Sequence, residues 1–266
     1  MIAAIIQART SSKRLPGKVL MPLLGMPMLG RQIERVRHAR TLDEIVVATS
    51  HDPSDQALVD FCQSINIRCV RGDLDDVLER YHLAAEVVGA SVIVRLTGDC
   101  PLCDPGVIDA LVDKYAMGGF DYVSNTLSPT FPDGLDTEAF SRQALDTAYR
   151  CAELPSEREH VTSYIKNSEA FTKFNFENDV DLSGLRWTID EPEDFELIRR
   201  IFEELYPQNP MFGMSDILNL LERHSAWSDL NRHIGRDEGY ARSLMEDETY
   251  ERADRDDEPA TPKPWI

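Results

Sequence analysis

The residues best suited to chemistry near the amino terminus form the segment QARTSSKRLPGK, residues 7–18. It carries four cations in a polar stretch that contains Ser, Pro and Gly, a composition typical of loops. Small residues between the cations would let backbone N–H groups approach an anion closely. This combination suits a ligand as highly charged as a triphosphate, with a solvated turn as the alternative. The cations are Arg9, Lys13, Arg14 and Lys18, and the small residues include Ala8, Ser11, Ser12 and Gly17.

Two other loops each place one aspartate after an apolar segment. Asp99 lies in RLTGDCP, and Asp190 ends WTID just before Pro192, which suits the first turn of a helix. Carboxylate oxygens suit a hard cation such as Mg2+, which keeps several waters and bridges substrate phosphates. Each aspartate could instead cap the helix that follows it. Together with the cationic loop, the pair predicts a site for a metal-bound triphosphate.

Other motifs in the chain are incomplete. Residues 25–30 have the glycine spacing of a P-loop, but Arg31-Gln32 stands where its Lys and Ser or Thr belong, and no GxGxxG occurs. The CxxC at 100–103 has no second pair to complete a zinc site, so we interpret it as a turn with two incidental thiols. The acidic pair at 179 and 181 follows polar residues and not a hydrophobic strand, which disfavours the metal motif of a plain glycosyltransferase.

The charge is strongly acidic overall and basic at one place. Among 266 residues there are 28 Lys and Arg and 47 Asp and Glu, a net charge of −19. Such acidity argues against a general nucleic-acid binder, yet residues 1–40 hold eight basic side chains and one acid. No apolar run approaches the roughly 18 residues of a membrane span, and the five Cys favour a reducing compartment. We therefore expect a cytoplasmic protein with a local anion site and with no nucleic-acid or membrane partner.

The elements that must position these loops alternate regularly over the first 125 residues. Short apolar runs alternate with amphipathic segments, which predicts a parallel sheet covered by helices. Ligands of such sheets bind where strands end, and the cationic loop and Asp99 both fall there. Strands are expected at 2–6, 44–49, 66–70, 91–96 and 121–124, and helices at 27–39, 54–64, 75–88 and 105–115.

The pattern changes after residue 124. A loop at 125–138 carries two prolines and a glycine and is long enough to suggest that it serves a site. We predict one domain over 1–245 and an acidic, Pro-containing, poorly ordered tail at 246–266. Helices are expected at 141–151, 156–166, 192–205 and 215–223, and a strand pair at 171–176 and 186–188.

The segments QARTSSKRLPGK, RLTGDCP and WTIDEPEDF together resemble the cytidylyltransferases that make CMP-activated acidic sugars, such as Kdo and acylneuraminate cytidylyltransferases. The resemblance covers residues 1–205 and is closest to the branch named for spore coat polysaccharide biosynthesis protein F. It implies an α/β, three-layer αβα nucleotidyltransferase fold with a mostly parallel central sheet, similar to the nucleotide-binding half of glycosyltransferases. The implied reaction is attack of a sugar oxygen on the α-phosphorus of CTP with release of pyrophosphate. Dimers are common in this family, which makes a homodimer a candidate assembly, but the sequence itself does not give the oligomeric state.

The resemblance also implies roles for individual residues. Lys18, Arg14 and Asp99 would be catalytic: Arg14 and Lys18 hold the triphosphate with Arg9, and Asp99 holds Mg2+ with Asp190. Such transfer is mainly positioning and charge neutralisation, which agrees with these residue types. The remaining nucleotide-binding candidates are Ala8 and Thr97 near the base, Ser12 in the cationic loop, and Arg80 in DDVLERY.

The acceptor contacts cannot be transferred in the same way. Kdo enzymes carry a Gln and an acidic residue around the Gly-Asp turn, where this chain has Thr97 and Cys100. Two other segments, PDGLDTE at 132–138 and EREH at 157–160, are therefore our candidates for the acceptor site. The acids suit hydroxyls or an amine, and the basic residues suit a carboxylate. The candidates are Asp136, Glu138, Arg158 and His160.

The resulting hypothesis is a Mg2+-dependent cytidylyltransferase that uses CTP and a small sugar acceptor. Two alternatives stay open from the sequence. One is a sugar-1-phosphate nucleotidyltransferase that uses another nucleoside triphosphate. The other is a non-catalytic nucleotide-binding partner of a polysaccharide pathway.

Overall fold

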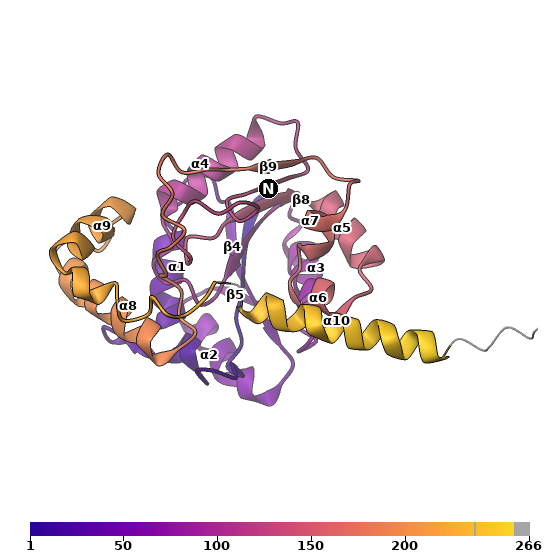
Figure 1. Cartoon of the computed structure of the whole chain (residues 1–266), viewed down its shortest axis with the longest axis horizontal. Helices are drawn as coiled ribbons and strands as arrows, with labels where there is room; N and C mark the ends of the chain where they lie inside the picture. Colours follow the sequence, from indigo (N-terminus) through magenta and orange to yellow (C-terminus); the bar gives the residue numbers. More distant parts are fainter. Residues whose placement is uncertain (237, 258–266) are drawn as a thin grey trace, which may run out of the picture.

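A seven-stranded sheet lies at the centre of the molecule, whose structure is a computed structural model that describes residues 1–236 and 238–257 (Figure 1). The strand order is β5-β4-β1-β6-β8-β7-β9. The first four run parallel, β8 is antiparallel to both of its neighbours, and β9 is parallel to β7. The prediction of a mostly parallel central sheet is therefore confirmed. The strands are β1 (Ile2–Gln7), β4 (Glu44–Ser50), β5 (Arg68–Gly72), β6 (Val92–Thr97), β7 (Tyr122–Ser124), β8 (Glu138–Ser141) and β9 (Lys173–Asn175).

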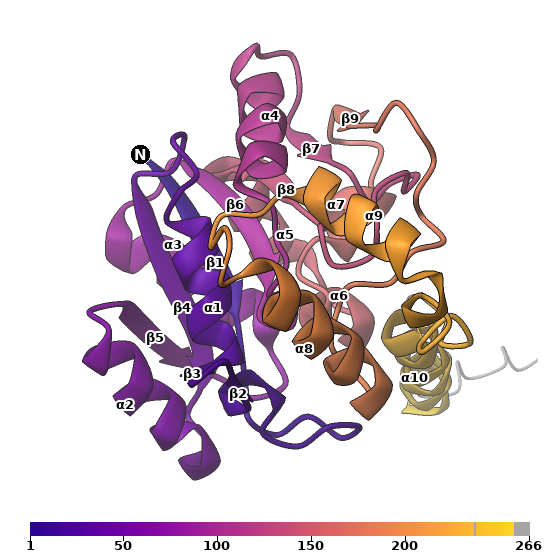
Figure 2. The same cartoon turned by 90° about the vertical axis from the view of Figure 1, so that its left-hand side faces the viewer.

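Helices cover both faces of this sheet and give the expected three layers (Figures 1 and 2). Figure 2 views the layer that contains α1 and α8. Helices that pack in the first core are α1 (Met28–Val36), α2 (Gln56–Ser64), α4 (Pro105–Ala116), α8 (Pro192–Leu205) and α9 (Met214–Arg223). Helices that pack in the second are α3 (Val77–Val88), α5 (Arg142–Cys151) and α7 (Ser163–Asn167). A small hairpin, β2 (Pro22–Leu23) and β3 (Met26–Pro27), precedes α1.

The side chains of β1 divide between the two cores. Ala4 and Ile6 pack in the first core, and Ala3 and Ile5 pack in the second. Successive side chains of a strand point to opposite faces, so a strand covered on both faces needs a continuous apolar run. The run ends at Gln7, which is half-buried at the carboxyl edge of the sheet. The chemistry of the cationic loop therefore begins where the apolar strand stops.

The helix expected at 156–166 is two helices in the structure. α6 (Pro155–Glu159) ends before His160, and α7 begins at Ser163. Between them Val161 has φ of 60°, which is strained for a β-branched residue. Its side chain is fully buried in the second core, and this packing holds the break. Because of this break, α6 and α7 do not continue along one helix axis.

Two predictions of secondary structure in the second half are wrong, one of a loop and one of a strand. Glu138 was assigned to the end of a loop, but it begins β8, which pairs antiparallel with β6 and β7. The segment 186–188 forms only an isolated bridge, between Arg186 and Asp133. Local apolar runs do not reveal either result, because both depend on which distant backbone lies alongside.

The acidic carboxy-terminal region is a helix over most of its described length. α10 (Glu238–Asp257) continues through residue 246, where we had placed the start of a poorly ordered tail. The Asp247 carboxylate, 7% exposed, accepts a hydrogen bond from the Ser156 N–H at 2.9 Å, and this contact ties α10 to α6. The prediction for 258–266 lies outside the described residues. Across the described part of the chain, no helix combines the length and the apolar character that crossing a membrane requires.

Candidate active site

The cationic loop is anchored at both of its ends. Backbone and hydroxyl of Thr10 donate to Asp55 at 2.7 and 2.8 Å. Gly17, with φ of 71°, donates its N–H to the Thr10 carbonyl at 2.8 Å and closes the loop. Burial opposes ionisation of Asp55, but hydrogen bonds from Ser50 and Thr10 outweigh it and lower its pKa. The sequence analysis missed Asp55, and its only signal was a carboxylate just after the neighbouring strand β4.

Lys18 meets both predicted metal-binding aspartates. Its ammonium nitrogen lies 2.9 Å from Asp99 Oδ2 and 2.8 Å from Asp190 Oδ1, and it also donates to the Ile189 carbonyl at 2.6 Å. Burial alone would lower the pKa of Lys18, but the two carboxylates outweigh it and raise that pKa. Burial likewise opposes ionisation of Asp99, but Lys18 holds the pKa of Asp99 below its usual range. Lys18 and Asp99 are therefore both charged at neutral pH.

Backbone contacts bring the two aspartates together. Gly98 donates its N–H to the Gln7 carbonyl at 2.8 Å, and a Cβ at Gly98 would lie 2.5 Å from that oxygen. Only glycine therefore lets the turn approach β1 this closely and place Asp99 at the sheet edge. Ile189, next to Asp190, donates its N–H to the Asp99 carbonyl at 2.9 Å. This bond joins loops that are about ninety residues apart in the sequence.

Asp190 is also held by two arginines. Arg14 lies 2.9 Å from Asp190 Oδ1, and Arg186 lies 2.8 Å from Oδ2. Arg186 also pairs with Asp133 at 2.8 Å and with Asp194 at 2.9 Å. The sequence analysis missed Arg186, although it stands four residues before Asp190 and directly precedes the segment WTIDEPEDF.

The pair Asp99 and Asp190 fits a hard divalent cation. Both carboxylates reach the single Lys18 ammonium, so both already face one positive centre. Throughout the described ranges, no group of three or more His, Cys, Asp or Glu side chains could hold a metal ion. A cation bound here would take two protein carboxylates, with its other positions left for water and ligand oxygens, which is how proteins usually hold Mg2+.

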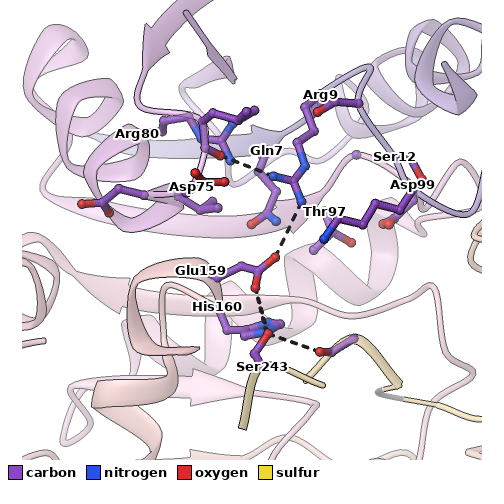
Figure 3. Close-up of a pocket in the computed structure, with 18 of the residues that line it drawn as sticks. Gln7, Arg9, Ser12, Asp75, Arg80, Thr97, Asp99, Glu159, His160 and Ser243 are labelled. Carbon is purple, nitrogen blue, oxygen red and sulfur yellow. Dashed lines mark hydrogen bonds and ion pairs between the residues drawn. The ribbon is translucent and has the colours of Figure 1, made fainter. Parts of the chain in front are cut away.

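These residues line a cleft of about 720 Å3 (Figure 3). Its walls come from the end of β1, the Gly-Asp turn, the start of α3, the end of α6 and one side of α10. Most of the predicted site residues meet here although they are scattered through the sequence. The predicted residues that line it are Ala8, Arg9, Ser12, Arg14, Lys18, Arg80, Thr97, Asp99, Arg158, His160 and Asp190.

The Arg80 side chain lines the cleft with part of its hydrogen-bonding capacity unused. It is 2% exposed, and its Nε and Nη1 atoms are buried with no hydrogen-bond partner in the described part of the chain. Burial, and then the nearby charge of Arg9, lowers the pKa of Arg80. Leaving buried donors unpaired costs free energy that an acceptor on a ligand would recover. Arg80 is therefore the strongest sign of a ligand that lies outside the cationic loop.

The opposite wall is built by α6 and α10. Arg9 pairs with Glu159 at 3.6 Å, and Glu159 accepts a hydrogen bond from Ser243 at 2.8 Å. The Ser243 hydroxyl also lies 2.9 Å from His160 Nε2 (Figure 3). The EREH segment suggested for the acceptor contains Glu159, but the sequence did not single out Glu159 or Ser243, because their contact depends on how α10 packs against α6.

Comparison with known proteins decides the family. The family model described as "Cytidylyltransferase" matches residues 3–224. The chain belongs to the cytidylyltransferase family. It is 35% identical over 231 residues to the spore coat polysaccharide biosynthesis protein SpsF of Bacillus subtilis, covering 84% of this chain and 95% of that one. The expected nucleotidyltransferase family is thereby confirmed.

Solved structures agree with this assignment. A cytidylyltransferase from Leptospira borgpetersenii superposes with a TM-score of 0.80 at 32% identity, covering 85% of this chain and 95% of that one. A CMP:2-keto-3-deoxy-manno-octonic acid synthetase complexed with CTP superposes with a TM-score of 0.62 at 18% identity, covering 76% and 98%. The second likeness shows the fold alone. In this cytidylyltransferase α10 lies beyond the residues that the family model matches, although it lines the cleft.

Two of the four acceptor candidates reach the cleft. His160 lines it beside Ser243, as described above. Arg158 also lines it, but its Nε donates to Asp76 at 2.9 Å and its Nη1 donates to the Tyr149 carbonyl at 2.8 Å. Asp76 in turn caps the start of α3 by accepting from the Glu79 N–H at 2.8 Å. The charge of Arg158 is therefore already matched within this cytidylyltransferase.

The other two candidates, Asp136 and Glu138, are not among the residues that line the cleft. Asp136 pairs with Arg236 at 2.6 Å. Glu138 is 2% exposed because β8 buries it, and it contacts Arg95, the Tyr122 hydroxyl at 2.7 Å and Lys166 at 3.4 Å. Burial opposes its ionisation, but Arg95 and Lys166 lower the pKa of Glu138 to about 2. The prediction that this loop carries acids to the acceptor is corrected for Glu138, which is an internal ion-pair partner.

Proposed function

We propose that this cytidylyltransferase transfers CMP from CTP to a sugar or sugar-acid acceptor, releases pyrophosphate and requires Mg2+. One observation carries the proposal. Lys18 joins Asp99 and Asp190 within one cleft, directly beside the cationic loop. This arrangement supplies what a nucleoside triphosphate needs, which is cations for the phosphates and two carboxylates for a metal.

The chain's own charges would handle the phosphates. Arg14 and Lys18 now pair with Asp190, and both are close enough to the cleft to transfer these contacts to phosphate oxygens. Mg2+ held by Asp99 and Asp190 would offset negative charge on the triphosphate. The acceptor hydroxyl oxygen attacks the α-phosphorus and its proton passes to water, the bond from that phosphorus to the oxygen that bridges to the β-phosphorus breaks, and pyrophosphate leaves. Lys18 is protonated before the ligand binds because its carboxylate partners raise its pKa, and the negative phosphates that replace them would keep it protonated.

The nucleoside would lie beside the residues with unused donors. Ala8, Thr97 and Arg80 line the part of the cleft formed by the sheet edge and α3. Arg80 Nε and Nη1 need an acceptor. The CTP bound in the structurally similar synthetase supports CTP as the nucleotide.

Two points concern the acceptor and the assembly. Relatedness to a spore coat polysaccharide biosynthesis protein supports a role in surface polysaccharide or glycan synthesis. Arg158 and His160 are the proposed acceptor contacts that the cleft retains. The homodimer suggested by the family resemblance stays a prediction, which light scattering on the purified protein would test.

The proposal is tested by titrating the protein with CTP, UTP, GTP and ATP in the presence of Mg2+ by calorimetry. We expect CTP to bind most tightly, and binding to weaken when Mg2+ is removed. Pyrophosphate release is then measured with CTP and a panel of sugars and sugar acids, and it should depend on both substrates. Tighter binding of another nucleotide would instead indicate a sugar-1-phosphate nucleotidyltransferase. Binding of CTP without turnover across the panel would count against an enzyme that uses these acceptors.

A further inference from the structure

Three polar side chains lie in a row on one face of the sheet, on the neighbouring strands β1, β6 and β8. Arg95 is opposite Glu138 in the register of β6 with β8, and opposite Ile5 in the register of β6 with β1. Gln7 stands two residues beyond Ile5, so its side chain lies on the same face. The row runs from Glu138 in the interior through Arg95 to Gln7 at the edge of the cleft.

The inner end of this row is rigid. Glu138 contacts Arg95, and it is also held by the Tyr122 hydroxyl and by Lys166. Its low pKa keeps it ionised, and Glu138 in turn outweighs the effect of burial and raises the pKa of Arg95. A buried ion pair seldom stabilises a fold more than apolar residues of the same size would. Removing one partner of such a pair destabilises a protein, but that does not explain why this face of the sheet carries a charged pair in place of apolar residues.

The outer end of the row fixes the orientation of an amide. Arg95 Nη2 donates to Gln7 Oε1 at 3.3 Å. A guanidinium has no acceptor, so the Gln7 atom that faces it must be the oxygen. The Gln7 Nε2 atom then turns away from Arg95, and no group in the described part of the chain accepts a hydrogen bond from it. Because Gln7 lines the cleft, this donor is available to a ligand (Figure 3).

We propose that the Glu138–Arg95 pair positions Gln7 so that its amide N–H donates to the pyrimidine ring of the nucleotide, and that Gln7 thereby favours cytosine over uracil. The inference rests on the proposed function. At ring position 3 cytosine carries an acceptor nitrogen, whereas uracil carries an N–H. An amide whose N–H is held in this orientation therefore donates to the cytosine nitrogen and meets an N–H of like polarity in uracil. Such a site discriminates between the two bases more strongly than an apolar site would.

The position of Gln7 within the cleft supports the base as its partner. The cations that suit phosphates, Arg14 and Lys18, contact the carboxylates that suit a metal ion, Asp99 and Asp190. Gln7 belongs to a different group, on the sheet face that packs against α3, from which Arg80 also reaches the cleft. A neutral amide with one fixed donor is a weak partner for phosphate and a specific one for a ring nitrogen.

The test compares the dissociation constants of CTP and UTP, measured by calorimetry with Mg2+, in the wild-type protein and three variants. The wild type should prefer CTP by about tenfold or more. Gln7→Leu should bring the ratio of the two constants close to one, mainly by weakening CTP. Gln7→Glu, which presents acceptors only, should move the ratio toward UTP. Gln63→Leu, at an exposed position on α2 that does not line the cleft, is the matched control and should keep the wild-type ratio.

Glu138→Gln tests the positioning role of the buried pair. We expect the CTP preference to fall about threefold or more, because Arg95 loses its charged partner and Gln7 is held less firmly. Glu138→Asp should recover part of that preference. A purely structural role for Glu138 would lower the melting temperature and leave the CTP to UTP ratio unchanged, which would overturn the positioning claim.

The failure of this inference differs from the failure of the proposed function. If the wild type binds CTP but both Gln7 variants keep its CTP to UTP ratio, Gln7 does not read the base and the proposed function stands. A wild type that binds CTP and UTP equally would also overturn the inference. A wild type that binds no nucleoside triphosphate would overturn the proposed function itself.

Discussion

The two ends of the cleft differ in whether their polar groups are already paired within the protein. At the end formed by Lys18, Asp99 and Asp190, which we call the phosphate end, every one of these charged groups already pairs with another. At the end formed by Gln7 and Arg80, the nucleoside end, residues that line the cleft carry donors without partners in the described part of the chain. A ligand at the phosphate end must exchange existing ion pairs, whereas a ligand at the nucleoside end satisfies donors that nothing else uses. The first end should therefore govern chemistry, and the second should govern affinity and choice of nucleotide.

The largest effect is expected at the phosphate end. Asp99→Asn removes the charge of one carboxylate proposed to hold the metal while it keeps the size of the side chain, and we expect turnover to fall by about a hundredfold or more. Pyrophosphate release with CTP and an active acceptor is the measurement. Asp179→Asn is the matched control, because Asp179 lies outside the cleft, and its turnover should be unchanged. Loss of less than about tenfold in Asp99→Asn, roughly 1.4 kcal/mol, would mean that Asp99 does not hold the metal.

The buried support of the nucleoside end should appear in stability and its dependence on pH. Glu138 has a pKa of about 2, compared with an ordinary value of 4.5, mainly because of Arg95. A lowered pKa contributes stability that is fully present above the ordinary value and is lost as the pH falls toward 2. Glu138→Gln should therefore lower the free energy of unfolding near pH 7 by an amount on the order of 3 kcal/mol.

This difference between Glu138→Gln and wild type should shrink by roughly half when urea denaturation is repeated at pH 3. A difference that stays constant between pH 7 and pH 3 would mean that the charge of Glu138 contributes nothing. The nucleoside end would then rest on packing alone, and the contrast between the two ends would weaken.

A matched pair of arginines separates a ligand-binding role from a structural one. Arg80→Met should weaken CTP binding by about tenfold to a hundredfold, with little loss of stability in the absence of nucleotide, because buried unpaired donors disappear. Arg35 is equally buried and its Nη1 atom also has no partner in the described part of the chain, but it donates to the carbonyls of Cys103 at 2.9 Å and Phe212 at 2.7 Å. Arg35→Met should therefore destabilise the protein and leave CTP affinity nearly unchanged. The same response from both variants, measured by calorimetry and thermal melting, would remove Arg80 from the list of ligand contacts.

The sequence allowed prediction of the phosphate end and of Arg80, but not of Gln7 or of the buried pair behind it, for a physical reason. Charges such as Lys18 and Asp99 follow apolar strands directly, and parallel strands bring their carboxyl ends to one edge. Glu138 and Arg95 form a pair only because β8 runs antiparallel to β6 in one register, and local composition does not contain that register. Glu138 was therefore assigned to an exposed loop, and Gln7 was taken only as the start of the cationic segment.

The part of the cleft wall that α10 forms could not be predicted from the sequence, for a different reason. A run of acids after residue 245 has the composition of a solvated tail. Asp247, a member of that run, caps α6 through the Ser156 N–H, and Ser243 contacts Glu159 and His160. These contacts join segments more than eighty residues apart, so only the folded chain shows that acidic residues serve as local partners here.

The smallest effect is expected where the two ends meet, at the Arg9–Glu159 pair. Both side chains are about one-third exposed, at 33% and 38%, and the pair spans 3.6 Å, so it contributes little to stability. The pair does hold the Arg9 guanidinium, and its Glu159 carboxylate places a negative charge beside the cleft. Glu159→Gln should therefore tighten CTP binding by about threefold at low salt, and the gain should fade as salt screens the charges.

Glu86→Gln removes the same charge from an exposed position on α3 outside the cleft, and it separates this local effect from the change in net charge. If both variants tighten CTP binding equally, only the net charge matters. If Glu159→Gln weakens binding, Glu159 orients Arg9 toward the ligand instead of competing with it. In that case Arg9 belongs to the nucleoside end, and Arg14 is the first cation of the loop that belongs to the phosphate end.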